Sequence, residues 1–201
     1  MKPQKDYIIL LHGFLRTSAS MKKLEKHLSK KGYKVINLNY PSKKHNIADL
    51  SQNFLAQAIK KNCTDKSKRI HFVTHSMGGI LVRYFLAKNK LKNLGRIVML
   101  APPNKGSKLA DILSKSKLTK RILGPALKEL KTDNKSLIQS LPPANYELGI
   151  IAGKFDAKVP PKNSKLKGMK DFLTIPCTHA FIMNKPKTIT ATKDFIETGK
   201  F

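Results

Sequence analysis

Six short apolar runs, separated by amphipathic segments, constrain the fold of this 201-residue chain more than any other feature. Each run has four to six residues and is rich in Ile, Val, Leu and aromatic side chains, which is typical of strands buried on both faces. The runs are Asp6–Leu11, Lys34–Asn39, Arg69–Thr74, Arg96–Leu100, Leu148–Ala152 and Phe172–Ile175.

Between these runs, apolar residues recur at three- and four-residue spacing, which indicates amphipathic helices. Clear examples are Met21, Leu24 and Leu28, then Leu50, Phe54, Leu55 and Ile59, then Ile80, Leu81, Tyr84 and Phe85. This alternation predicts an α/β fold with a doubly wound, mostly parallel sheet of about six strands flanked by helices. Because no internal repeat or low-complexity linker interrupts it, we expect one domain over residues 1–201.

Two stretches interrupt the alternation. Residues 106–142 contain helical patterns and no strand, which predicts a small helical cap or lid after the fourth strand. Within it, residues 108–131 place Leu and Ile among Lys and Arg, so a basic amphipathic surface that contacts anionic membranes is the alternative. Residues 153–170, with Pro160, Pro161 and Gly168, are expected to form a loop without a helix.

The charge balance is strongly basic, since 40 Lys and Arg against 12 Asp and Glu give a formal net charge of +28 at pH 7. Such a field attracts nucleic acid, anionic lipid headgroups and acidic substrates without selecting among them. No helix-turn-helix, zinc-finger or aromatic RNA-binding signature accompanies it, so we expect no specific nucleic-acid partner. A solvated Lys-rich surface that reflects the host's codon usage is the simplest interpretation.

Cysteine usage and the first apolar run bear on the compartment. Cys63 and Cys177 lie far apart and match no metal-ligand spacing, which argues against a disulfide framework or a zinc site. The run Tyr7–Leu11 has only five residues and leads directly into a motif, so it is neither a signal peptide nor a membrane span. These features predict a cytoplasmic protein with reduced thiols.

The residues directly after the predicted strands are the candidates for a functional site. In a parallel sheet the carboxyl ends of all strands meet at one edge, where such folds bind ligands. The candidates are His12 to Phe14, His75 and Ser76, Pro102 to Asn104, Gly153 to Asp156, and Cys177 to His179.

Ser76 lies where the third predicted strand turns into a helix, in the run THSMGG at 74–79. A sharp strand-to-helix turn exposes a Ser hydroxyl at its apex and needs small neighbours, which Gly78 and Gly79 supply. The run matches G-x-S-x-G except that Thr74 replaces the first Gly, where a β-branched side chain crowds the turn. The pattern predicts Ser76 as a nucleophile rather than as a buried helix-capping residue.

A Ser hydroxyl needs a base to take its proton, and His is the usual one. Of the six His residues, His179 follows the last strand and precedes the last helix, so its loop can bring the imidazole to Ser76. His75 adjoins Ser76 and is directed elsewhere by the turn, and His12 is expected to brace its own loop. The others fall in a helix, a loop and a strand: His27, His45 and His71.

A carboxylate should orient that base. Asp156 and Asp171 are the acidic residues available between the final two strands. Asp171 begins the last strand, at the wrong edge of the sheet, whereas Asp156 follows the end of the preceding strand and is therefore predicted. The N–H groups of Phe14 and Met77 are placed to bind the negative charge that develops on a substrate carbonyl.

Several motifs together resemble the lipase and esterase branch of the α/β-hydrolase family. They are LHGF at 11–14, HSMGG at 75–79, LVRY at 81–84, APPNKGS at 101–107, Asp156 with Val159, Thr178-His179 and FIETGKF at 195–201. The resemblance implies an α/β-hydrolase fold and hydrolysis of a small-molecule or lipid ester through an acyl-enzyme. It implies no metal or organic cofactor.

The residues leave the substrate and the oligomeric state open. Lipases, short-chain esterases, thioesterases and acyltransferases share such a triad, and a non-catalytic binding scaffold or a polyanion-binding protein are the alternatives outside catalysis.

Overall fold

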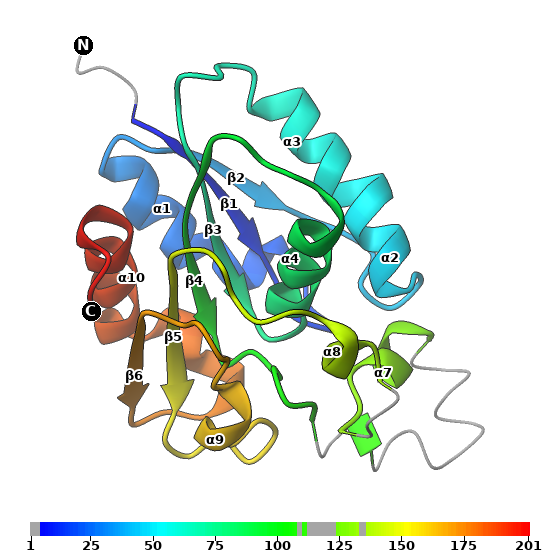
Figure 1. Ribbon diagram of the computed structural model, residues 1–201. Helices are drawn as coiled ribbons and strands as arrows, with labels where there is room; N and C mark the ends of the chain where they lie inside the picture. Colours follow the sequence, from blue (N-terminus) through cyan, green and yellow to red (C-terminus); the bar gives the residue numbers. More distant parts are fainter. Residues whose placement is uncertain (1–4, 108–109, 112–123, 133–135) are drawn as a thin grey trace.

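The computed structural model describes residues 5–107, 110–111, 124–132 and 136–201, and Figure 1 shows how they are arranged. Six strands form one sheet in the order β2-β1-β3-β4-β5-β6, and every neighbouring pair is parallel. The strands are β1 (Tyr7–Leu11), β2 (Lys34–Leu38), β3 (Ile70–His75), β4 (Leu94–Leu100), β5 (Leu148–Gly153) and β6 (Asp171–Ile175). The predicted α/β sheet is confirmed, and it is wholly rather than mostly parallel.

Helices cover both faces of the sheet (Figure 1). One face carries η1 (Ser18–Met21), α1 (Lys22–Lys30), η3 (His179–Asn184) and α10 (Pro186–Thr198). The other carries α2 (Ile47–Asp49), the π-helical segment η2 (Leu50–Leu55), α3 (Ala56–Asn62) and α4 (Met77–Lys88). The short helices α7 (Ala126–Glu129), α8 (Leu137–Ser140) and α9 (Pro161–Ser164) lie toward the edge to which the strand arrows point.

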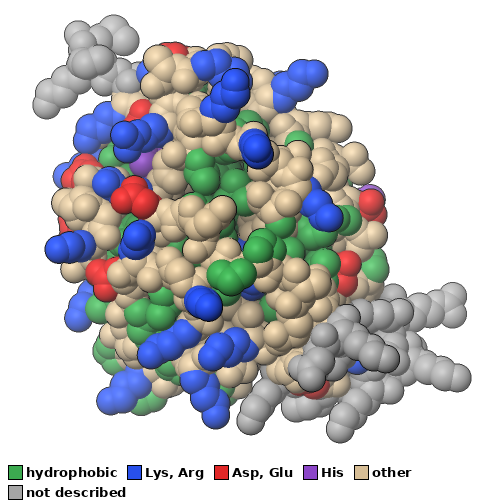
Figure 2. Space-filling model, viewed as in Figure 1, with side chains coloured by type: hydrophobic (Ala, Val, Ile, Leu, Met, Phe, Trp, Pro, Cys, Tyr) green, Lys and Arg blue, Asp and Glu red, His purple; other side chains and the backbone are tan. Residues whose placement is uncertain are grey.

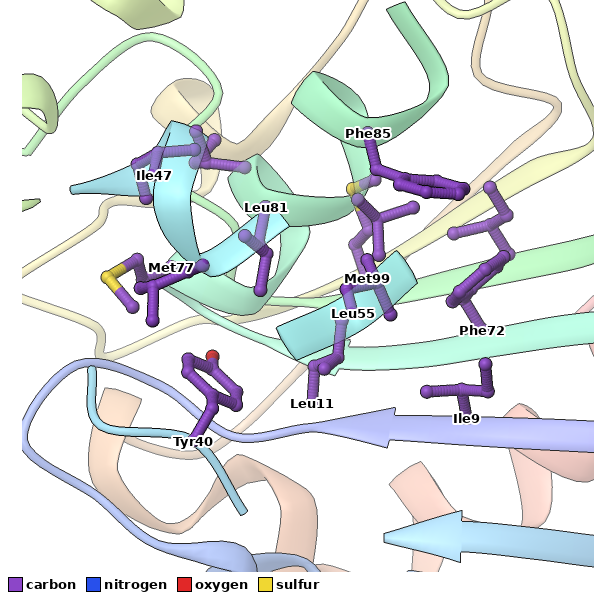
Figure 3. Close-up of a cluster of buried hydrophobic side chains, with 14 of the residues drawn as sticks. Ile9, Leu11, Tyr40, Ile47, Leu55, Phe72, Met77, Leu81, Phe85 and Met99 are labelled. Carbon is purple, nitrogen blue, oxygen red and sulfur yellow. The ribbon is translucent and has the colours of Figure 1, made fainter. Parts of the chain in front are cut away.

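The core has two halves because alternate residues of each strand face opposite sides. Ile8 and Leu10 of β1 pack with α1 and α10, while Ile9 and Leu11 pack with η2 and α4. Figure 3 shows the second half, in which Leu81 and other side chains extend from α4 toward the strands. Burial on both faces explains why the strands appear in the sequence as continuous apolar runs.

The prediction of a loop without a helix at residues 153–170 was wrong, because α9 forms one helical turn at Pro161–Ser164. Pro161 occupies the first helical position, where the missing N–H of proline leaves no hydrogen bond unmade. Four residues are too few to show an apolar period, so the sequence pattern gives no sign of this turn.

The predicted cap at residues 106–142 lies partly outside the described residues. Its described parts include α7 and α8, and the side chains of Ala110, Leu127 and Leu130 are buried against the core. The assignment of this segment as a cap stays a prediction, as does the assignment of residues 1–201 to one domain.

Candidate active site

Ser76 occupies the apex of the turn between β3 and α4, with φ 52° and ψ −120°. A residue other than glycine rarely adopts a positive φ, and backbone strain of this kind clusters at functional sites. The Ser76 N–H donates to the carbonyl oxygen of Leu100 at 2.8 Å, which ties the turn to the neighbouring strand β4.

Two glycines let α4 approach the sheet closely enough to form this turn. A Cβ atom on Gly78 would lie 2.8 Å from the Leu11 carbonyl oxygen. A Cβ atom on Gly79 would lie 3.1 Å from Pro102 Cβ and 3.3 Å from Thr74 Oγ1. Thr74 is buried, and its side chain fits because Gly79 opposite it has none, which relieves the crowding expected of a β-branched residue here.

The side chains of Ser76, His179 and Asp156 form a continuous series of hydrogen bonds. His179 Nδ1 lies 2.6 Å from Asp156 Oδ2, and His179 Nε2 lies 3.0 Å from Ser76 Oγ. An ionised carboxylate can only accept hydrogen bonds, so His179 Nδ1 carries the proton and Nε2 directs its lone pair at the Ser76 hydroxyl. This tautomer is the one that a general base requires.

Backbone donors hold the Asp156 carboxylate in place. Its side chain is fully buried, and its Oδ1 accepts the N–H groups of Lys158 at 2.9 Å and Val159 at 2.8 Å. These two donors, which sequence reasoning missed, compensate the lost hydration of the charge. The competing candidate, Asp171, lies at the start of β6 and accepts the N–H groups of Phe172 and Phe201 instead.

The assignment of the Phe14 and Met77 N–H groups as oxyanion donors stays a prediction. Within the described residues neither group donates a hydrogen bond to the protein. Met77 is the first residue of α4, so its N–H has no acceptor in the helix and lies at the positive end of the helix dipole.

His12 braces the loop that carries Phe14. Its ring stacks on Tyr40 at 4.1 Å between centroids, its Nδ1–H donates to the Gly13 carbonyl oxygen at 2.9 Å, and its Nε2 accepts the Tyr40 N–H at 3.3 Å. Burial lowers the pKa of His12 below its ordinary value of 6.5. The ring is therefore neutral and fixed, as expected for a structural residue.

His75 contacts the candidate site in a way that sequence reasoning missed. Its Nε2–H donates to the carbonyl oxygen of His179 at 3.1 Å, and the two rings lie 4.9 Å apart. Burial, aided by electrostatic interaction with His179 and Arg16, holds the pKa of His75 well below 6.5, so the ring is neutral. The sequence shows that His75 directly precedes Ser76, but it does not show that the His75 ring points toward His179.

Ser76 and His179 open into a cleft of about 540 Å³. Residues 14–17, 19 and 20, which follow β1, line one side, and Lys158 and Val159 from the loop after β5 line another. Apolar side chains line the cleft as well, and they include Ala110, Leu127 and Leu130. Among the described residues, no Asp or Glu side chain lines this cleft.

In the part of the chain that the structure describes, no three His, Cys, Asp or Glu side chains are grouped so that they could hold a metal ion. Both cysteines are free and buried. No helix among these same residues combines the length and the apolar character needed to cross a membrane.

Similar solved structures include lipases and a phospholipase. The mature lipase BlEst2 from Bacillus licheniformis has a TM-score of 0.75 at 19% identity, with 100% of this chain and 94% of that chain covered. Lipase B from Aspergillus fumigatus has a TM-score of 0.78 at 16% identity, with 98% of this chain and 53% of that chain covered. Phospholipase PlaB from Legionella pneumophila has a TM-score of 0.70 at 15% identity, with 94% and 58% covered.

The chain thus spans little more than half the length of the last two proteins. At these identities the likeness shows the fold alone. No curated protein sequence matches the chain at a significant level. The family model described as the alpha/beta hydrolase fold matches residues 6–139, which include β1, β3, β4 and the turn at Ser76. The chain therefore belongs to the α/β-hydrolase fold family.

Proposed function

We propose that this chain is a serine hydrolase that cleaves carboxylic esters, of small molecules or lipids, through an acyl-enzyme. The observation that carries the proposal is the hydrogen-bonded series from Asp156 through His179 to Ser76, which ends at the wall of a cleft. The lipases among the similar structures support the same class of chemistry.

In the first half of the reaction, Ser76 Oγ attacks the ester carbonyl carbon while His179 Nε2 takes the hydroxyl proton. The carbonyl oxygen becomes negatively charged and accepts the N–H groups of Phe14 and Met77, which need no reorientation. Asp156 stays ionised and stabilises the imidazolium. His179 then gives the proton to the departing alcohol oxygen, which leaves an acyl group on Ser76.

In the second half, His179 takes a proton from water, whose oxygen attacks the acyl carbon. Collapse of this second intermediate releases the carboxylic acid and returns the proton to Ser76. A thioester substrate or an alcohol in place of water would use the same steps. Comparison of oxygen esters, thioesters and added alcohols as co-substrates therefore distinguishes an esterase from a thioesterase or an acyltransferase.

The first test is labelling by a fluorophosphonate probe, followed by mass spectrometry of the modified peptide and hydrolysis of 4-nitrophenyl esters graded by chain length. We expect the label on Ser76, and we expect Ser76→Ala to fold normally and to lose about 10⁴-fold or more in ester hydrolysis. An unlabelled Ser76, or near wild-type hydrolysis by the Ala variant in protein free of other esterases, would refute the proposal.

The second test compares two carboxylates at opposite edges of the sheet. Asp156→Asn should lower kcat by about 10³–10⁴-fold, because the amide no longer holds His179 in its tautomer. Asp171→Asn is the matched control, since its carboxylate accepts the backbone N–H groups of Phe172 and Phe201 and, among the described residues, no other donor. The kcat of this variant should stay near wild type. Similar small losses from both variants would show that the orienting carboxylate is misassigned.

A further inference from the structure

Three large apolar side chains stand out as exposed among the described residues, and all three lie beside proposed active-site residues. The exposed fractions are 56% for Leu15, 61% for Phe155 and 60% for Phe181. Each is within two residues of an oxyanion donor or a triad member. Single exposed apolar residues are common on protein surfaces. What requires an explanation is that all three exposed side chains belong to segments that carry proposed active-site residues.

The segments that carry these three side chains follow the carboxyl ends of the parallel strands β1, β5 and β6, and contacts join the segments. The segment η1, which follows Leu15, packs against η3, which contains Phe181. The Phe155 N–H donates to the Cys177 carbonyl oxygen at 3.1 Å, which joins its loop to the segment that precedes His179. Leu15 itself lines the cleft.

The backbone at Leu15 strengthens the argument for an external partner. Leu15 has φ 56°, a conformation that costs free energy in any residue with a β-carbon. Its N–H donates to Ser42 Oγ at 3.2 Å, which fixes this conformation. A leucine that is both strained and exposed contributes little to the folded core, so its apolar surface is available to something outside the chain.

Cationic side chains accompany these apolar ones. Arg16 and Lys158 line the cleft, and Lys154 Nζ lies 5.9 Å from the centre of the Phe155 ring. Figure 2 shows Lys and Arg side chains projecting from the lower edge, toward which the strand arrows of Figure 1 point. Apolar anchors interleaved with cations match a lipid surface, where the anchors enter the acyl region and the cations bind anionic headgroups.

We propose that this edge docks on an anionic lipid surface and presents the cleft to esters held there. The edge, called the catalytic rim below, consists of Leu15, Arg16, Lys154, Phe155, Lys158 and Phe181. The inference rests on the proposed function for its chemistry, whereas docking itself requires no catalysis. It differs from the alternative raised by the sequence, in which residues 108–131 contact the membrane.

The test uses the full chain with Ser76→Ala, so that vesicles stay intact, and measures flotation with vesicles of phosphatidylcholine alone or mixed equally with phosphatidylglycerol. We expect binding to the anionic vesicles only, and weaker binding as salt rises from about 0.05 to 0.5 M, where the Debye length falls from roughly 14 Å to 4 Å. Replacement of Leu15, Phe155 and Phe181 by Ser should weaken the partition constant by at least about tenfold.

A matched pair of charge variants separates a defined surface from a general effect of the +28 charge. One variant replaces Arg16, Lys154 and Lys158 by Gln. The other replaces Lys61, Lys90 and Lys92, which are exposed and lie near the amino ends of the strands. Both remove three charges, yet only the rim variant should lose vesicle binding. Circular dichroism confirms that each variant is folded.

Equal losses from the two charge variants, full binding by the Ser variant, or no binding to anionic vesicles would each overturn the proposal. A rim variant that changes only the oligomeric state would assign this face to a second copy of the chain and would overturn it as well. Fluorophosphonate labelling of Ser76 is measured separately, so failure of the rim and failure of the proposed chemistry are distinguishable.

Discussion

At the scale of single residues, His75 connects the turn at Ser76 to His179, the proposed base. The turn at Ser76 fixes where the His75 side chain lies, and its Nε2–H donates to the backbone carbonyl oxygen of His179. A Cβ atom on Gly13 would lie 2.7 Å from His75 Nδ1, so the ring is also confined from its other side. We infer from this contact that His75 positions His179, the proposed base, and takes no part in proton transfer.

The pair His75→Phe and His75→Gln tests this role. Phe keeps a planar ring but offers no donor to His179, so we expect kcat to fall by about 10–100-fold with little change in KM, because the imidazole moves relative to Ser76. Gln retains an N–H donor and should recover part of the loss. Steady-state kinetics with a soluble ester provides the measurement. If the two variants lose activity equally, His75 has a packing role only.

At the scale of elements, the close approach of α4 to β1 sets the position of Ser76. Gly78→Ala should destabilise the fold by about 1–3 kcal/mol, because the added carbon meets the backbone carbonyl of Leu11, which cannot move without distorting β1. The Cβ of Gly79→Ala meets Pro102, Met99 and Thr74 at 3.1–3.3 Å, which is less close than the 2.8 Å contact at Gly78, and the variant gains up to about 1 kcal/mol in helix propensity. Its loss of stability should therefore be smaller.

Urea denaturation of both glycine variants measures this difference in the free energy of unfolding. A larger loss of stability in Gly79→Ala than in Gly78→Ala would contradict this prediction. It would mean that the contact of α4 with β4, which contains Met99, limits the position of the helix more than the contact with β1 does.

At the scale of the whole molecule, three buried histidines make stability depend on pH. Burial lowers the pKa of His12, His71 and His75 in the folded state, whereas in the unfolded chain each titrates near 6.5. As the pH falls below 6.5, the unfolded chain therefore binds more protons than the folded one, and stability is lost. Each histidine contributes a slope of at most about 1.4 kcal/mol per pH unit until the folded pKa is reached.

Urea denaturation at pH 7, 6 and 5 should accordingly show a falling free energy of unfolding. His71→Gln is a suitable variant for comparison, because His71 lies near the amino end of β3, bonded to the Arg96 N–H and to Asp6, and away from the cleft. Its slope between pH 6.5 and 5 should be shallower than that of the wild type. An unchanged slope would show that His71 is not among the groups that cause the loss.

Much of the fold and of the candidate site could be predicted because their signals are local. A strand buried on both faces must be apolar throughout, so six such runs separated by helical patterns specify a parallel sheet, and a parallel sheet brings its strand ends together. The strand-to-helix turn at Ser76 and the positions of Asp156 and His179 after β5 and β6 follow from that rule. The helix α9 could not be predicted in this way, because its four residues are too few to show a helical spacing of apolar side chains.

The tertiary structure alone decided the contacts that connect loops far apart in the chain. The bond from His75 to the His179 carbonyl joins residues 104 positions apart, and the exposure of Phe155 and Phe181 depends on which neighbours fail to cover them. Local periodicity reports which face of an element is buried, but not the distance between two loops or the direction in which a side chain leaves them. Those quantities are set by how the helices pack on the sheet.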